Sequence, residues 1–205
     1  RDVERSRGLG DVYKRQTMKV IYTNSWASID LEKEAAESLI ADGCVLISQH
    51  ADTTGASTAC EKAGVPIVGY NVSMIATAPT QALTSASIDW GPYYTYAVKS
   101  VIDGTKIDTD WCKGYDDGAD KITELNDKAI AKGTKEKVKE VEDAIKDGSL
   151  HVFDTSTFTV DGKELDSWKD DNGNEYIKDG YFHESELHSA PAFAINIDGI
   201  ESVEK

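Results

Sequence analysis

The chain has 205 residues, 40% of them hydrophobic, and a formal net charge of −15 at pH 7. This length supports one ordinary core, or about one and a half lobes of a two-lobed protein. The negative charge argues against nucleic acid and anionic membranes as partners, because phosphates would be repelled at long range. No run approaches the roughly 18 consecutive apolar residues of a transmembrane helix.

The first sixteen residues differ in composition from the rest of the chain. They contain all four arginines and show no hydrophobic period. This predicts a non-native, adaptor-like segment over residues 1–17, with a native basic tail as the alternative. We expect residues 1–16 to pack against nothing in the main core.

Short apolar runs alternate with amphipathic segments between residues 18 and 89. The runs predict buried strands and the segments predict helices. The predicted strands cover 20–22, 45–47, 67–70 and 83–86, and the predicted helices run from Asp30 to Ala41 and from a cap at Thr53 or Thr54 to Ala63. This alternation indicates an α/β fold with a parallel, Rossmann-like sheet and helices on both faces.

The second half of the chain is less regular. A helix is predicted from Gly91 to Ile102 and a strongly charged one from Thr134 to Ile145. The remaining predicted elements are short strand-like pieces within 111–125, a strand at 150–153, and a hairpin joining 165–168 to 176–177 through a turn at 171–174.

Polar and aromatic residues follow the predicted strands, at the edge where open α/β sheets bind ligands. Trp26 would offer a flat face to a purine, a contact worth about 1–3 kcal/mol per base in nucleic-acid complexes. His50 and Asp52 could bond the edge of a heterocycle, and Asn71 presents both a donor and an acceptor. The candidate ligand-binding residues are Trp26, Gln49, His50, Asp52, Asn71 and Trp90.

These residues also have purely structural interpretations. Trp26 could pack between two lobes, and Asn71 could simply form a turn. His50 and Asp52 could lie on a solvated loop, and a metal site there lacks a third residue at ligand spacing. The acidic segment 170–175 resembles a calcium loop but lacks its glycine and its bidentate glutamate, so a turn is favoured.

No motif of a catalytic nucleophile or of a phosphate-binding loop occurs, so we expect no enzyme activity, no cofactor and no metal. Cys44, Cys60 and Cys112 are widely spaced and form no CxxC pair. They are interpreted as buried thiols, neither a disulfide framework nor a zinc site.

The ordered set of segments VIYTNSW, LISQHADTTG, GVPIVGYN, LTSASIDWGPYYTYAVKSVIDGT and DAIKDGSLHVF resembles the second half of the basic membrane protein (BMP) family of substrate-binding lipoproteins. The resemblance runs from about Lys19 to Phe153, and Ala192–Ile200 looks like the family's last strand. It implies a type I periplasmic-binding fold, in which two Rossmann-like lobes joined by crossover segments close on a ligand. Several members bind purine nucleosides.

The resemblance also implies a domain organisation and a setting. Residues 18–89 would form the second ligand-binding lobe, 90–130 a crossover segment returning to the first lobe, and 131–205 a return to the second lobe with a C-terminal hairpin and strand. The first lobe, the signal peptide and the N-terminal lipid anchor would lie in a part that precedes this chain. The protein would then be an extracytoplasmic lipoprotein that delivers a purine nucleobase or nucleoside to ABC permease subunits.

Two alternatives stay open: a binding protein or sensor for another small ligand, and an α/β enzyme fragment. The nucleoside-binding branch of the family carries an acidic residue where this chain has Asn71, and a lysine near Ser87–Trp90. Both are missing here, and no Arg or Lys occupies any of the four strand ends. We therefore expect nucleobase to bind more tightly than nucleoside, and nucleotide least of all.

The helix from Gly91 to Ile102 would return to the first lobe. Without that lobe, its apolar face should be exposed and the chain should self-associate. The residues of this face are Tyr94, Val98, Val101 and Ile102.

Overall fold

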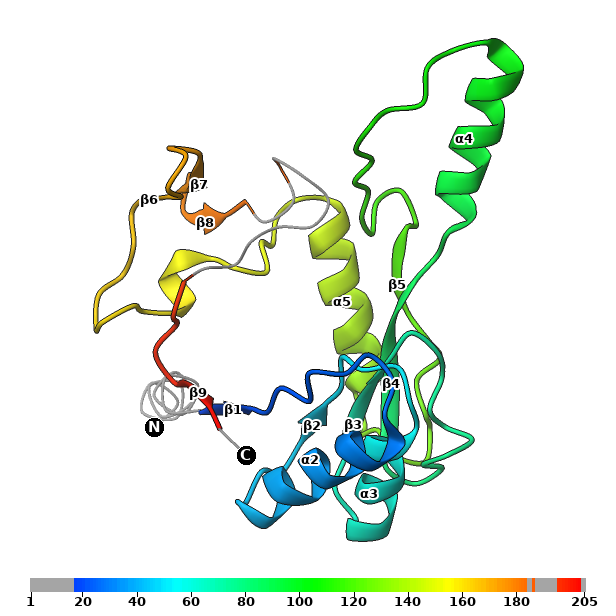
Figure 1. Cartoon of the computed structure of the whole chain (residues 1–205), viewed down its shortest axis with the longest axis vertical. Helices are drawn as coiled ribbons and strands as arrows, with labels where there is room; N and C mark the ends of the chain where they lie inside the picture. Colours follow the sequence, from blue (N-terminus) through cyan, green and yellow to red (C-terminus); the bar gives the residue numbers. More distant parts are fainter. Residues whose placement is uncertain (1–16, 184–185, 187–194, 204–205) are drawn as a thin grey trace. The chain divides into compact units, whose positions relative to one another are not determined.

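The structure is a computed structural model that describes residues 17–183, 186 and 195–203 (Figure 1). Its contacts divide the chain into two units, one comprising Ile21–Asp147 and the other Arg1–Val20 with Gly148–Lys205. The predictions made for residues 1–16 lie outside the described residues.

A four-stranded sheet organises the unit Ile21–Asp147. Its strands are ordered β2 (Ile47–Ser48), β3 (Ile67–Tyr70), β4 (Ala82–Ile88) and β5 (Asp120–Ile122). The strands β2, β3 and β4 are parallel, and β5 runs antiparallel to β4. The predicted α/β fold with a parallel sheet is therefore confirmed, and β5 lies within 111–125, where short strand-like pieces were predicted.

Two helices pack on this sheet, α2 (Ile29–Ala41) and α3 (Gly55–Ala63). The Ser28 side chain caps α2 by accepting from the backbone N–H of Leu31. The Thr53 hydroxyl accepts from the N–H of Gly55 at 3.2 Å, whereas the side chain of Thr54 makes no capping bond. Both helices share one core with the sheet, formed by Ala36, Ile47, Ala56, Ala59, Cys60, Ile67, Met74, Ala78 and Ala82. Helices on the opposite face of the sheet stay a prediction.

Two of the predicted buried strands are placed differently. The first strand is β1 (Met18–Val20). It belongs to the unit that contains Gly148–Lys205, where it pairs in parallel with β9 (Ile200–Ser202), and it is not part of the four-stranded sheet. At the second, Val45 is 82% exposed and only Ile47 enters the core. An apolar run favours an extended backbone but does not specify its partner, and β2 has a single neighbour in the described sheet.

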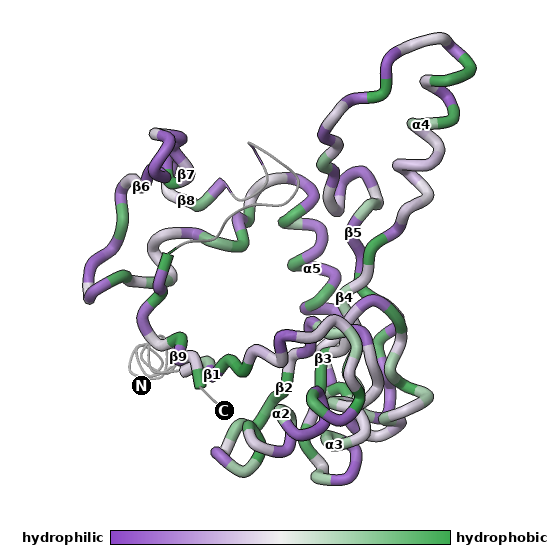
Figure 2. Tube along the Cα trace, viewed as in Figure 1, coloured by the Kyte–Doolittle hydropathy of each residue, from purple (hydrophilic) through white to green (hydrophobic). Residues whose placement is uncertain are grey.

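The helix α4 (Gly91–Asp103) begins with a proline in its first turn and ends at Gly104 in the left-handed conformation. Its predicted apolar face is exposed, as expected: Tyr94, Val98, Val101 and Ile102 have exposed fractions between 59% and 77%. Hydrophobic residues recur along this helix in Figure 2.

We expect this face to cause self-association, because isolated domains seldom expose a contiguous apolar patch. Sedimentation velocity of the chain should show a concentration-dependent shift to larger species. A Val98→Glu, Ile102→Lys double variant should suppress the shift, and Lys99→Glu on the same helix should not. A monomer at all concentrations would contradict the prediction.

The helix α5 (Thr134–Lys146) matches its prediction, although Gly133 supplies the N-cap and no side chain bonds there. The unit that contains Gly148–Lys205 has a small antiparallel sheet of β6 (Trp168–Lys169), β7 (Glu175–Lys178) and β8 (Tyr181–Phe182). This sheet confirms the predicted hairpin. Its core contains Tyr176, Ile177, Phe182 and Ile195.

The turn between β6 and β7 is held by Asp170, whose Oδ1 accepts from the N–H groups of Asn172 and Asn174 at 2.9 Å each. The turn interpretation of the acidic segment is therefore confirmed. One other prediction is wrong. Residues 150–153 form no strand: 152–153 form a turn, although the carbonyl of Phe153 accepts from the N–H of Phe182 at 3.0 Å. Of the strand predicted within 192–200, residues 192–194 lie outside the described residues, 195–199 form no strand, and β9 begins at Ile200.

Candidate functional site

The loops that follow the parallel strands of the four-stranded sheet meet at its carboxyl edge. The N–H of Asp52 donates to the carbonyl of Trp26 at 3.0 Å, so the segment before α2 is joined to the loop after β2. The ring of His50 contacts the ring of Tyr70 edge to face, with centroids 4.7 Å apart. The Trp26 side chain is 84% exposed, which leaves its face free for a ligand.

A buried polar pair holds these two loops in place. Glu32 is only 3% exposed, and its carboxylate accepts from the N–H of Thr53 at 3.2 Å and of Ser28 at 3.4 Å. Gln49 is 8% exposed and donates through Nε2 to the carbonyls of Ala51 and Thr53 and, at 3.3 Å, to Glu32. Glu32 therefore fastens the Trp26 segment to the loop that carries His50 and Asp52.

The structure gives Gln49 a positioning role in its own loop. The Oε1 atom of Gln49 is buried and accepts no hydrogen bond from the described residues. Direct contact of Gln49 with a ligand stays a prediction. Glu32 was not singled out from the sequence, because an acidic residue in the first turn of a helix is common there for electrostatic reasons alone.

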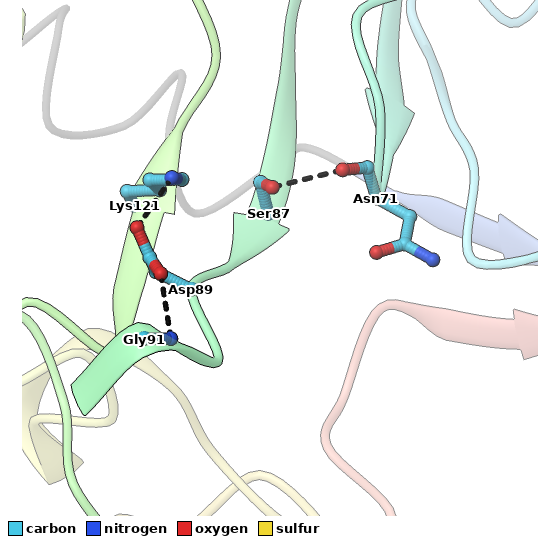
Figure 3. A network of polar contacts seen from close by, with 5 residues as sticks. All are labelled: Asn71, Ser87, Asp89, Gly91 and Lys121. Atoms are coloured by element: carbon cyan, nitrogen blue, oxygen red, sulfur yellow. Dashed lines mark hydrogen bonds and ion pairs between the residues drawn. The ribbon is translucent and has the colours of Figure 1, made fainter. Parts of the chain in front are cut away.

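Asn71 follows β3 in the left-handed conformation, with φ 69°. Its N–H donates to the carbonyl of Ala86 at 2.7 Å, and its own carbonyl accepts from the hydroxyl of Ser87 at 2.8 Å. Asparagine tolerates this backbone better than most residues, so the turn interpretation holds. The side-chain amide points away from Ser87 (Figure 3) and stays available for a ligand.

An ion pair lies just beyond the end of β4. Lys121 Nζ is 2.8 Å from Asp89 Oδ2, and Asp89 Oδ1 accepts from the N–H of Gly91 at 2.9 Å (Figure 3). The hydrogen bond from Lys121, followed by the one from Gly91, lowers the pKa of Asp89. Asp89 is therefore held in its ionised form at neutral pH.

Lys121 overturns the expectation that no cation lies at the strand ends. In the antiparallel ladder of β4 and β5, Lys121 is directly opposite Ser87, and opposed residues project on the same face. The sequence offers no local signal for this placement, because the lysine comes from a strand more than thirty residues later in the chain.

Trp90 precedes α4 and is half-exposed, with ring centroids 6.4 Å from those of Tyr93 and of Tyr94. The ring centroid of Tyr93 is in turn 5.4 Å from that of Trp111. Trp90 is therefore the first member of an aromatic group that extends through Tyr93 to Trp111. Trp90 directly follows Asp89 in the sequence. The ring contacts of Trp90 are with Tyr93 and Tyr94, and not with Trp26.

Among the described residues, no group of three or more His, Cys, Asp or Glu side chains is placed to hold a metal ion. The buried-thiol interpretation holds for Cys60, whose burial raises its pKa to about 11, but Cys112 is exposed. Every helix in the described ranges falls short of the length and apolarity needed to cross a bilayer.

An α/β unit with exposed aromatic and hydrogen-bonding groups at the carboxyl ends of parallel strands has the arrangement in which open α/β sheets bind ligands. Comparison with known proteins identifies which one. The sequence profile of the Bmp family, described as ABC transporter substrate-binding protein PnrA-like, matches residues 6–151. The chain belongs to this family, which consists of substrate-binding proteins and not of enzymes. The family resemblance predicted from the strand-end segments is confirmed.

Two curated relatives are similar over most of the chain. A purine-binding protein of Brucella abortus (strain 2308) is 34% identical over 147 residues, which are 72% of this chain and 41% of the relative. A Haloferax volcanii protein, named as an ABC transporter glucose-binding protein, is 30% identical over 159 residues, 77% of this chain and 40% of the relative. The chain thus spans about two fifths of the length of these relatives.

Two solved structures are also similar. A transcriptional activator of the comK gene from Bacillus halodurans has a TM-score of 0.56 at 15% identity, covering 64% of this chain and 47% of that one. An ABC transporter solute-binding protein from Conexibacter woesei DSM 14684 has a TM-score of 0.48 at 21% identity, covering 64% and 44%. At 15% identity, the similarity to the Bacillus halodurans structure supports the fold alone.

Proposed function

We propose that this chain contributes the second lobe of an extracytoplasmic solute-binding protein that binds a purine nucleobase or nucleoside and delivers it to an ABC importer. ABC transporter substrate-binding proteins act outside the cytoplasm. The observation that carries the purine assignment is the exposed ring of Trp26, held beside the His50–Asp52 loop. The 34% identity to a purine-binding protein supports it.

The chemistry of the strand ends favours an uncharged ligand. The groups around Trp26 are amides, an imidazole and carboxylates, and the cation at this edge, Lys121, is already paired with Asp89. A ribose would meet Asn71, which has one carbonyl oxygen and no charge, whereas a carboxylate would offer each of the two hydroxyls its own charged oxygen. Each ligand group left unpaired would cost about 1–3 kcal/mol. We therefore infer the order nucleobase, nucleoside, nucleotide.

A sugar is the second candidate ligand. The Haloferax volcanii relative is named as glucose-binding, and an exposed tryptophan can cover the apolar face of a sugar ring as well as a purine. The hydrogen-bonding groups of the His50–Asp52 loop would serve the hydroxyls of a sugar. The ligand order therefore needs a direct comparison of the two classes.

Calorimetric titration of the full-length protein that contains this chain tests the proposal. Adenine, adenosine, AMP and glucose are titrated in separate runs at the same ionic strength. We expect adenine to bind most tightly, adenosine next and AMP at least tenfold more weakly than adenosine. Tightest binding of AMP would contradict the order, and binding of glucose alone would replace the purine with a sugar.

The remaining assignments rest on the same proposal. The first lobe would supply the opposite wall of the ligand site, and residues 90–130 would cross to it through α4. The permease subunits and an N-terminal lipid anchor would be the partners of the whole protein. The exposed apolar face of α4 supports a covering lobe, because Val101 and Ile102 would otherwise remain in water.

A further inference from the structure

The ion pair of Asp89 and Lys121 lies in the row of polar groups that continues from Asn71 through Ser87. The Ser87 hydroxyl reaches the carbonyl of Asn71, Lys121 opposes Ser87 across the ladder, and Asp89 follows two residues beyond. Figure 3 shows these side chains along the ends of neighbouring strands. The pair thus lies at the same sheet edge as the candidate ligand residues.

Both oxygens of the Asp89 carboxylate are occupied, one by the N–H of Gly91 and the other by Lys121. The ammonium group has three donors, and Asp89 takes one of them. Both side chains are partly exposed, 50% for Lys121 and 41% for Asp89. The pair is therefore accessible to a ligand, and its charges cancel for any anion that approaches from solvent.

Such a pair contributes little to folding. Exposed ion pairs contribute little to stability, because solvent screens them and two long side chains lose freedom. An unpaired lysine at the same place would instead attract phosphate, since charge-assisted hydrogen bonds to an ammonium are among the stronger ones. The presence of Asp89 therefore matters more for ligand charge than for the fold.

We propose that Asp89 masks Lys121 and thereby makes this site selective for uncharged ligands over their phosphorylated forms. The proposal rests on the proposed function, because it assumes that a ligand occupies this edge of the sheet. Asp89 acts as a specificity-determining residue by holding Lys121, a cation that could otherwise bind a phosphate.

The test is the variant Asp89→Asn in the full-length protein. Asparagine keeps an oxygen acceptor for the N–H of Gly91 but removes the negative charge. The affinity ratio of AMP to adenosine should rise roughly tenfold, since one uncovered charge-assisted bond contributes about 1.4 kcal/mol or more. The double variant Asp89→Asn, Lys121→Met should return the ratio to its original value, and added salt should reduce the gain.

Asp103→Asn, an exposed acid at the end of α4, is the matched control and should leave the ratio unchanged. A ratio that stays constant in Asp89→Asn, or that rises equally in Asp103→Asn, would overturn the proposal. Inorganic phosphate provides a separate readout that does not depend on the purine assignment. It should bind Asp89→Asn more tightly than the double variant. Failure of adenine and adenosine to bind the unmodified protein would contradict the proposed function, while the phosphate comparison would still decide the role of Asp89.

Discussion

Replacing Trp26 with alanine is expected to weaken purine binding by roughly 5- to 150-fold. This range corresponds to the 1–3 kcal/mol that base–aromatic stacking contributes. The side chain is 84% exposed, so its loss should leave the core unchanged. The hydrogen bond from Asp52 goes to the backbone carbonyl of Trp26 and survives the substitution. Calorimetry with adenine on the full-length protein measures the effect.

Two further variants make this result specific. Trp26→Phe keeps an aromatic face and should recover part of the lost affinity. Val45→Ala shortens an apolar side chain of comparable exposure, 82%, just before β2 and should leave adenine binding unchanged. Equal affinities for Trp26→Ala and the unmodified protein would exclude stacking at this residue.

The parts of the fold that the sequence predicts well are those determined by local patterns. The helices α2, α3 and α4 follow from amphipathic spacing and from glycine stops at Gly64 and Gly104, both left-handed in the structure. The strand β3 was predicted with the bounds it has, because Ile67–Tyr70 is a short apolar run between turn residues. These signals operate within a few residues of the chain.

The predictions that failed depend on partners far away in the sequence. The run 20–22 is as apolar as β3, yet the strand there is Met18–Val20 and pairs with residues 200–202. The apolar residues of 150–153 form no strand either: 152–153 lie in a turn, and the backbone bond that the Phe153 carbonyl accepts comes from Phe182, far along the chain. Hydrophobic periodicity contains no information about which neighbour is present.

The candidate site shows the same division. Residues at the ends of parallel strands can be located from the sequence, because the fold class fixes the edge at which they gather. Trp26, His50, Asp52 and Asn71 are candidates proposed in this way. Lys121 and Glu32 were not: the first arrives through an antiparallel strand, and the second acts from inside α2 through its bonds to Ser28 and Thr53.

The close approach of α3 to α2 makes Gly55 the position where one added carbon should destabilise the fold most. A Cβ at Gly55 would overlap the carbonyl oxygen of Ile29 and lie 3.0 Å from the backbone nitrogen of Lys33. Neither atom can move without displacing α2 from the shared core. We expect Gly55→Ala to lower the free energy of unfolding by about 1–3 kcal/mol, as overpacking does elsewhere.

The same contact links stability to the site. Gly55 directly follows the loop of His50 and Asp52, and Ile29 directly follows the segment of Trp26. A shift of α3 away from α2 would therefore separate the two loops that Glu32 joins. Gly55→Ala should consequently weaken adenine binding as well, even at temperatures where the protein is fully folded.

Urea unfolding followed by circular dichroism measures the stability change, and calorimetry at a temperature well below the transition measures the binding change. Lys62→Ala, an exposed substitution on the same helix, is the control and should alter stability by less than about 0.5 kcal/mol. An unchanged urea midpoint for Gly55→Ala would show that the helices tolerate greater separation. The binding energy at the strand ends depends on where Trp26 and Asp52 lie and not on how tightly α2 and α3 are packed. Lowered stability with unchanged adenine affinity would therefore show that the two loops keep their geometry independently of the helix contact.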